Sequence, residues 1–134
     1  APMAALWARD HRGAMLRVVG APGDAATRIE NRLGEPSANP YLYMASQVVA
    51  GLDGLRRQLA PPRATDAPYA GQARLLPTTL GAAIEAFESD TLMSDAGGPA
   101  FARSFVQIKR SELARHDAAE DKTEWQRREY FSRF

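Results

Sequence analysis

The spacing of apolar residues changes once along this 134-residue chain, and that change limits the fold more than any other feature of the sequence. Up to residue 33 the apolar runs are short, and charged side chains alternate with uncharged ones over residues 27–33, which is typical of a strand. From Leu42 onward, apolar residues recur every three or four positions, which is typical of helices that pack on one face. Strands followed by helices predict an α+β fold.

The first 33 residues contain three candidate strands, over residues 3–9, 13–19 and 27–33. Gly and Pro residues between 20 and 24 mark a turn between the last two strands. Because the connections are short, we expect the three strands to form an antiparallel sheet.

A core helix is predicted over residues 39–59. Asn39 is a suitable N-cap, and Pro40 fits the first turn, where its missing N–H costs nothing. Its apolar positions share three- and four-residue spacing, which predicts a face turned toward the core. These positions are Leu42, Ala45, Val48, Val49, Leu52, Leu55 and Leu59.

The remaining residues divide into a proline-rich surface loop over 60–79 and a helical tail over 80–134. Within the tail we expect helices over 80–89, 101–115 and about 119–131, with Thr78 or Thr79 capping the first. The large apolar side chains of this tail are expected in the core. They are Phe101, Phe105, Ile108, Trp125, Tyr130 and Phe134. The charged positions, Glu112 among them, are expected on solvated faces.

Composition removes several classes of function. The 17 basic and 16 acidic residues nearly balance, which argues against a nucleic-acid partner. The chain has no cysteine for a thiolate metal site or nucleophile, and its two histidines, His11 and His116, lie far apart. No apolar run is long enough to span a bilayer, so we expect no membrane partner and a cytoplasmic location.

One segment carries candidate chemistry. On a strand, Arg28, Glu30 and Arg32 would share one face at intervals of about 6.6 Å. Glu30 could bind a divalent cation and the guanidinium groups could bind anionic oxygens, with Arg12 and Arg17 joining them. An exposed ladder of weak ion pairs is the simpler interpretation of these residues alone. Moreover, a turn or bulge near Arg12 would be needed to bring it to the face of Arg17, since five residues separate them.

Residues 28–42, with their Arg-Ile-Glu-Asn-Arg and Asn-Pro-Tyr-Leu motifs, resemble the C-terminal catalytic region of the glutamine synthetase family. This family includes ligases that join glutamate to other amines, such as gamma-glutamylputrescine synthetase. The similarity to the glutamine synthetase family extends to residues 7–17, residues 49–55 and the tail. The likeness therefore covers essentially the whole chain. The resemblance implies an α+β fragment from the C-terminal part of a glutamine synthetase-like catalytic domain.

The resemblance also implies roles for the charged residues. Glu30 would bind Mg²⁺ or Mn²⁺ near the nucleotide phosphates, and Arg32 would hold the glutamate substrate. Arg12 would stabilise the phosphoryl group during transfer, while Arg17 and Arg28 would contact ATP. In such enzymes ATP phosphorylates the side-chain carboxylate of glutamate, and ammonia or an amine then displaces phosphate. With the resemblance in place, a site is favoured over an ion-pair ladder.

Several parts of the family's site have no match in these residues. These are the flap loop with its glutamate, the other metal carboxylates and the N-terminal domain that completes each site in a neighbouring subunit. We therefore expect this chain to be a fragment that is inactive alone, from a parent that is a large homo-oligomer. The alternative is a standalone noncatalytic module that binds a partner or oligomerises.

Overall fold

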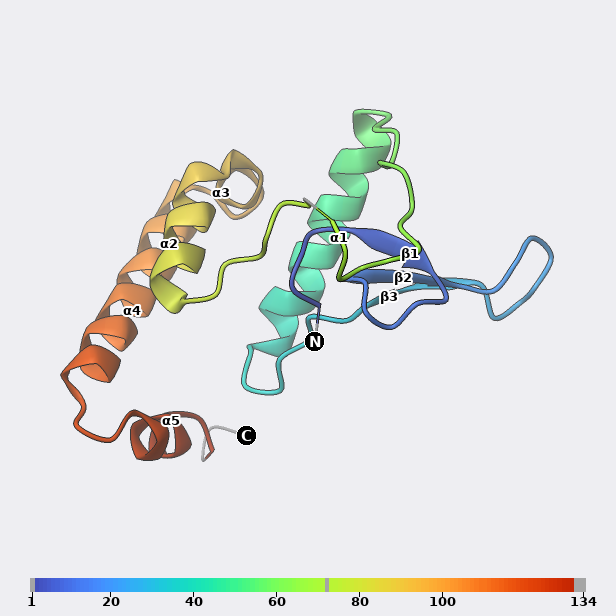
Figure 1. Cartoon of the computed structure of the whole chain (residues 1–134). Helices are drawn as coiled ribbons and strands as arrows, with labels where there is room; N and C mark the ends of the chain where they lie inside the picture. Colours follow the sequence, from blue (N-terminus) through green and yellow to red (C-terminus); the bar gives the residue numbers. More distant parts are fainter. Residues whose placement is uncertain (1, 72, 132–134) are drawn as a thin grey trace. The chain divides into compact units, whose positions relative to one another are not determined.

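The computed structural model describes residues 2–71 and 73–131, and it confirms an α+β arrangement of a three-stranded sheet and five helices (Figure 1). The strands are β1 (Trp7–Arg9), β2 (Leu16–Val19) and β3 (Arg28–Asn31). The helices are α1 (Pro40–Arg56), α2 (Leu80–Ser89), α3 (Thr91–Gly97), α4 (Pro99–Ala118) and α5 (Lys122–Tyr130). The chain forms two compact units: residues 1–35 with 59–76, and residues 36–58 with 77–134.

The sheet has the order β1-β2-β3, and only one of its two pairings is antiparallel. β2 and β3 pair antiparallel as expected, joined through a turn that begins at Gly20. Gly20 has a φ of 91°, and a Cβ added there would lie 2.7 Å from the Cα of Thr27. Glycine is therefore needed at this position for both its conformation and its space.

The prediction of a fully antiparallel sheet is wrong at β1, which pairs parallel with β2 from Trp7↔Leu16 to Arg9↔Val18. Parallel strands usually require a long crossover. Here six residues suffice because β1 is only three residues long. The return turn starts at Asp10, with a φ of 48°, and continues with the Ala14 amide donating to the His11 carbonyl.

The proline-rich segment is bound to the strands of its own unit rather than lying free. The Thr65 amide donates to the Trp7 carbonyl at 3.0 Å, and Trp7 Nε1 donates to the Pro62 carbonyl at 2.7 Å. Ala4 and Leu75 form an antiparallel bridge. The buried hydrophobic residues of this unit are all small: Ala4, Ala8 and Ala14.

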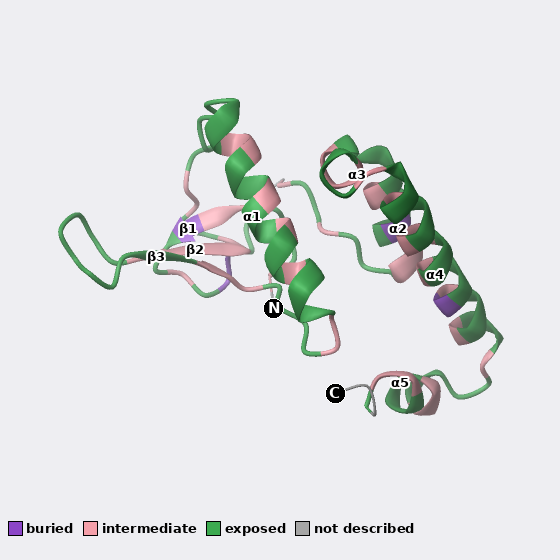
Figure 2. Cartoon of the chain, turned by 180° about the vertical axis from the view of Figure 1, so that it is seen from behind, coloured by how far each residue is buried: buried purple, intermediate pink, exposed green. Residues whose placement is uncertain are grey.

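α1 forms where the sequence predicts it, and the side chain of Asn39 accepts hydrogen bonds from the Tyr41 and Leu42 amides. Its predicted burial is wrong: α1 contains no buried residue, as Figure 2 shows, and Leu52 and Leu55 are 43% and 76% exposed. Local spacing fixed the helix and its apolar face, whereas burial depends on what covers that face.

The second unit also contains a hairpin of α2 and α4. Thr79 caps α2 by accepting from the Ala82 amide, as the sequence predicts. Ile84 is buried, and the Phe87 and Phe105 rings lie 5.2 Å apart. The seven-residue helix α3 was not predicted. It is capped by Asp90 and ends before Gly98, whose φ is 82°.

Glu112 on α4 corrects the expectation of a solvated charged face, because it is 2% exposed. Lys109 Nζ donates to one of its carboxylate oxygens at 2.8 Å, and the hydroxyl of Tyr130 on α5 donates to the other. Predicted core residues differ as well: Ile108 is 61% exposed, and Phe134 lies outside the described residues. None of the described helices combines the length and apolar character needed to cross a membrane.

Candidate functional site

The register of the sheet brings the candidate residues to one face. Arg17 on β2 lies directly opposite Glu30 on β3, and on its other side it pairs with Ala8 of β1. Residues paired directly across strands point to the same face, so these three form one cross-strand row. Ala8 is fully buried and Arg17 is largely buried, its side chain being 15% exposed.

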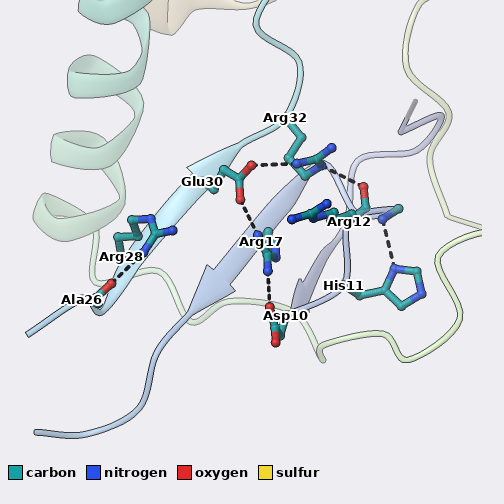
Figure 3. Close-up of polar contacts among 9 residues, drawn as sticks. Asp10, His11, Arg12, Arg17, Ala26, Arg28, Glu30 and Arg32 are labelled. Atoms are coloured by element: carbon teal, nitrogen blue, oxygen red, sulfur yellow. Dashed lines mark hydrogen bonds and ion pairs between the residues drawn. The ribbon is translucent and has the colours of Figure 1, made fainter. Parts of the chain in front are cut away.

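Four charged side chains alternate in sign along this face (Figure 3). Glu30 accepts from Arg17 Nη1 at 2.9 Å through Oε2, and from Arg32 Nη1 at 2.6 Å through Oε1. Arg17 also donates through Nη2 to Oδ1 of Asp10. We call Asp10, Arg17, Glu30 and Arg32 the charged row.

These contacts set the protonation of Glu30 and Arg17. The hydrogen bond from Arg17 lowers the pKa of Glu30, Arg32 adds to that effect, and partial desolvation opposes it. The hydrogen bonds to Glu30 and then to Asp10 raise the pKa of Arg17. Glu30 therefore stays an anion, which a metal ligand requires, and Arg17 stays a cation.

Arg12 and Arg28 have different positions. Arg12 lies in the turn after β1, where its backbone carbonyl accepts from Arg32 Nε at 2.8 Å. The turn that we expected near Arg12 is therefore present, and it brings the backbone of Arg12 to Arg32. Arg28 donates to the Ala26 carbonyl at 3.0 Å rather than to Glu30. The expected ladder of Arg28, Glu30 and Arg32 is thus made only on its Arg32 side, and the second partner of Glu30 comes from the neighbouring strand.

Sequence reasoning missed Asp10. Its amide donates to the Val18 carbonyl, which places it directly beyond the end of β1 and beside β2. The signal that could have found it is its position two residues after Ala8, because alternate residues of a strand share a face. That signal needed the parallel pairing of β1, which the short connection did not suggest.

Glu30 could offer a divalent cation one carboxylate. Its side chain is 33% exposed, and both of its oxygens already have arginine partners. Within residues 2–71 and 73–131 no group of three or more His, Cys, Asp or Glu side chains could hold a metal ion. Among the described residues, Glu30 is therefore not part of a cluster that could hold a metal ion.

Comparison with known proteins relates the whole chain to a family. Residues 1–130 match the family described as "Glutamine synthetase, catalytic domain". The chain is 46% identical over 142 residues to gamma-glutamylanilide synthase of Acinetobacter sp., covering 98% of this chain and 28% of that protein. It is 38% identical over 134 residues to gamma-glutamylethanolamide synthetase GlnA4 of Streptomyces coelicolor, covering 99% of this chain and 28% of that protein.

A solved structure described as "GmaS/ADP complex-Conformation 1" is similar in fold, with a TM-score of 0.76 and 32% sequence identity. The similarity covers 98% of this chain and 30% of that chain. This chain thus spans less than a third of the length of these relatives.

Proposed function

The chain belongs to the glutamine synthetase family, and from that membership we propose that it forms the arginine-rich part of an ATP-dependent glutamate ligase. The ligase would join the side-chain carboxylate of glutamate to ammonia or an amine through γ-glutamyl phosphate. The names of the anilide and ethanolamide relatives support an amine acceptor, and the ADP complex supports a nucleotide. The observation that carries the proposal is the Glu30 carboxylate, kept ionised between Arg17 and Arg32.

Each residue has a proposed role that suits its place. Glu30 would hold Mg²⁺ or Mn²⁺, which supplies positive charge beside the phosphates when it is bound. Arg32, fixed by Glu30 and by the Arg12 carbonyl, would hold the carboxylate of glutamate. Arg17 and Arg28 would contact ATP. Arg12, on the exposed turn, would stabilise the phosphoryl group during its transfer, because phosphoryl transfer depends on positioning and charge neutralisation.

We further propose that these 134 residues do not catalyse the reaction alone. Divalent cations take several oxygen ligands. Among the described residues, Glu30 does not belong to a group of three or more side chains that could bind one. The remaining metal carboxylates and the base that activates the amine would come from other parts of a complete ligase. We also propose that the complete ligase is a cytoplasmic homo-oligomer.

A noncatalytic binding or oligomerisation module is the second candidate function. The apolar side chains of α1 favour it: Leu42, Val48, Leu52 and Leu55 are each at least 38% exposed. Such a face is typical of a surface that another segment or partner covers. A chain that serves only this purpose would not depend on the charge of Glu30.

A chimera tests the proposal. This chain would replace the matching segment of the Acinetobacter gamma-glutamylanilide synthase, and ATP hydrolysis would be measured with glutamate, Mg²⁺ and amine. We expect turnover from the chimera, at least a hundredfold less from its Glu30→Gln variant, and none from the 134-residue chain alone.

Glu85→Gln supplies the matched control, because it removes the same charge from an exposed position on α2. If the chimera assembles and turns over but Glu30→Gln is as active as Glu85→Gln, the metal-ligand role is wrong. If the chimera assembles and never turns over, this chain is not a functional part of such a ligase, and the binding-module function is favoured.

A further inference from the structure

We propose that Asp10 is an exchangeable internal anion: it holds the phosphate-binding edge of Arg17 when no nucleotide is bound, and a phosphate group displaces it on binding. The inference rests on the proposed ATP-binding role of Arg17. It assigns a function to Asp10, which has no role in the proposed function. Asp10 would act as a positioning residue that does not touch the reacting atoms.

The geometry of the Arg17 guanidinium carries the argument. Its Nη1 is bound to Glu30, and its Nη2 is bound to a single oxygen of Asp10. The Nε of Arg17 is buried and has no hydrogen-bond partner among the described residues. Buried polar atoms are nearly always paired, so an unpaired one on a charged group requires an explanation.

Nε and Nη2 form one edge of the guanidinium plane, and this edge matches two oxygens of a phosphate or carboxylate. Asp10 satisfies only the Nη2 half of it. A phosphate that replaces Asp10 at Nη2 carries more negative charge than the carboxylate it displaces, and the buried Nε would have to become accessible before it could take a second oxygen. The edge is therefore better matched to a phosphate than to the residue that now occupies it.

Asp10 is suited to leave. Its side chain is 75% exposed, against 15% for Arg17, so it can return to water at little desolvation cost. Ion pairs with an exposed partner are weak and are easily replaced. Glu30 is different, because it is held from two sides and would keep Arg17 in place while Asp10 exchanges.

The test is the binding of inorganic tripolyphosphate to the 134-residue chain, measured by calorimetry at low salt. In Asp10→Asn the competing charge is lost while the shape is kept, and Asn tolerates the positive φ of 48° at this position. We expect the Kd to fall about two- to fivefold, the size of effect expected for losing a weak ion pair. Arg17→Gln should weaken binding more than tenfold.

Asp66→Asn is the matched control, since it changes the net charge equally at an exposed position of the loop after α1. If Asp10→Asn binds no more tightly than Asp66→Asn, or binds more weakly, the inference is overturned. If Arg17→Gln weakens binding in that same experiment, only the role of Asp10 fails. If Arg17→Gln binds like the wild type, the proposed role of Arg17 fails and the inference fails with it.

A measurement on the wild type protects the test against a variant that does not fold. The carbon-13 resonance of the Asp10 carboxylate and the nitrogen-15 resonance of Arg17 Nε should shift together during a titration with tripolyphosphate, with one midpoint. A shift at Arg17 Nε with no change at Asp10 would also overturn the exchange.

Discussion

Tyr130→Phe tests the attachment of α5 to α4, because it removes one oxygen atom and leaves the ring. The Tyr130 hydroxyl donates to Glu112, whose other carboxylate oxygen accepts from Lys109 Nζ at 2.8 Å. Glu112 is 2% exposed, so water cannot readily replace the lost donor. The variant would therefore leave a buried charged group with one donor fewer.

The size of the effect follows from that burial. A hydrogen bond to a charged group contributes roughly 1.5–3 kcal/mol to stability. Values toward the upper end of this range apply when the remaining partner stays buried. α5 has nine residues, and a helix of that length is not stable without tertiary contacts. We expect Tyr130→Phe to lower the free energy of unfolding by about 2 kcal/mol and to release α5 first.

Urea unfolding, followed by tryptophan fluorescence and circular dichroism, measures this change. Trp125 reports on α5 because its ring lies 6.0 Å from the Tyr130 ring and 5.3 Å from the His116 ring on α4. Tyr41→Phe is the matched control, since Tyr41 is 78% exposed and its variant should differ by less than about 0.5 kcal/mol. A loss in Tyr130→Phe no larger than in Tyr41→Phe would refute the reasoning.

Two further predictions concern helix ends and charges. Arg127 and Arg128 lower the pKa of Glu124 from 4.5 to about 2, so these ion pairs support α5 above pH 4.5 and lose that effect as the pH falls toward 2. A carbon-13 titration of the Glu124 carboxylate should give that low midpoint, and a midpoint near 4.5 would contradict the pairing. Asn39→Ala should cost α1 about 1 kcal/mol in urea unfolding, because two amides lose their acceptor, whereas an unchanged midpoint would show that the cap contributes nothing.

The features that sequence predicted correctly depend on neighbours in the chain. The cap at Asn39 and the cap at Thr79 each require only the residues of the next turn, and both are present. The charged face along β3 follows from alternation alone, so the placement of Glu30 and Arg32 together could be read from the five residues 28–32.

The features that sequence missed depend on pairings that the local spacing of residues does not fix. Glu112 looks like an exposed helical charge three residues from Lys109, and only Tyr130, 18 residues later, shows that it is buried. The parallel pairing of β1 likewise depended on strand length rather than on residue type. Asp10 could not be placed beside Arg17 without that pairing, so the error in the sheet and the omission in the site have one cause.

The charged row also shows why an ion-pair ladder and a binding site need not be opposed interpretations. The bonds that position Glu30 connect part-exposed side chains, and ion pairs of that kind hold a geometry without being costly to exchange. Glu30, between two arginines, is kept ionised and oriented, while the exposed Asp10 at the other edge of Arg17 is the partner that can be exchanged. Arg17 and Arg32 each use Nη1 to bind Glu30, so their other N–H groups would remain available for anions. The weakness that made a ladder the simpler interpretation of the sequence is the property that a site with exchanging ligands requires.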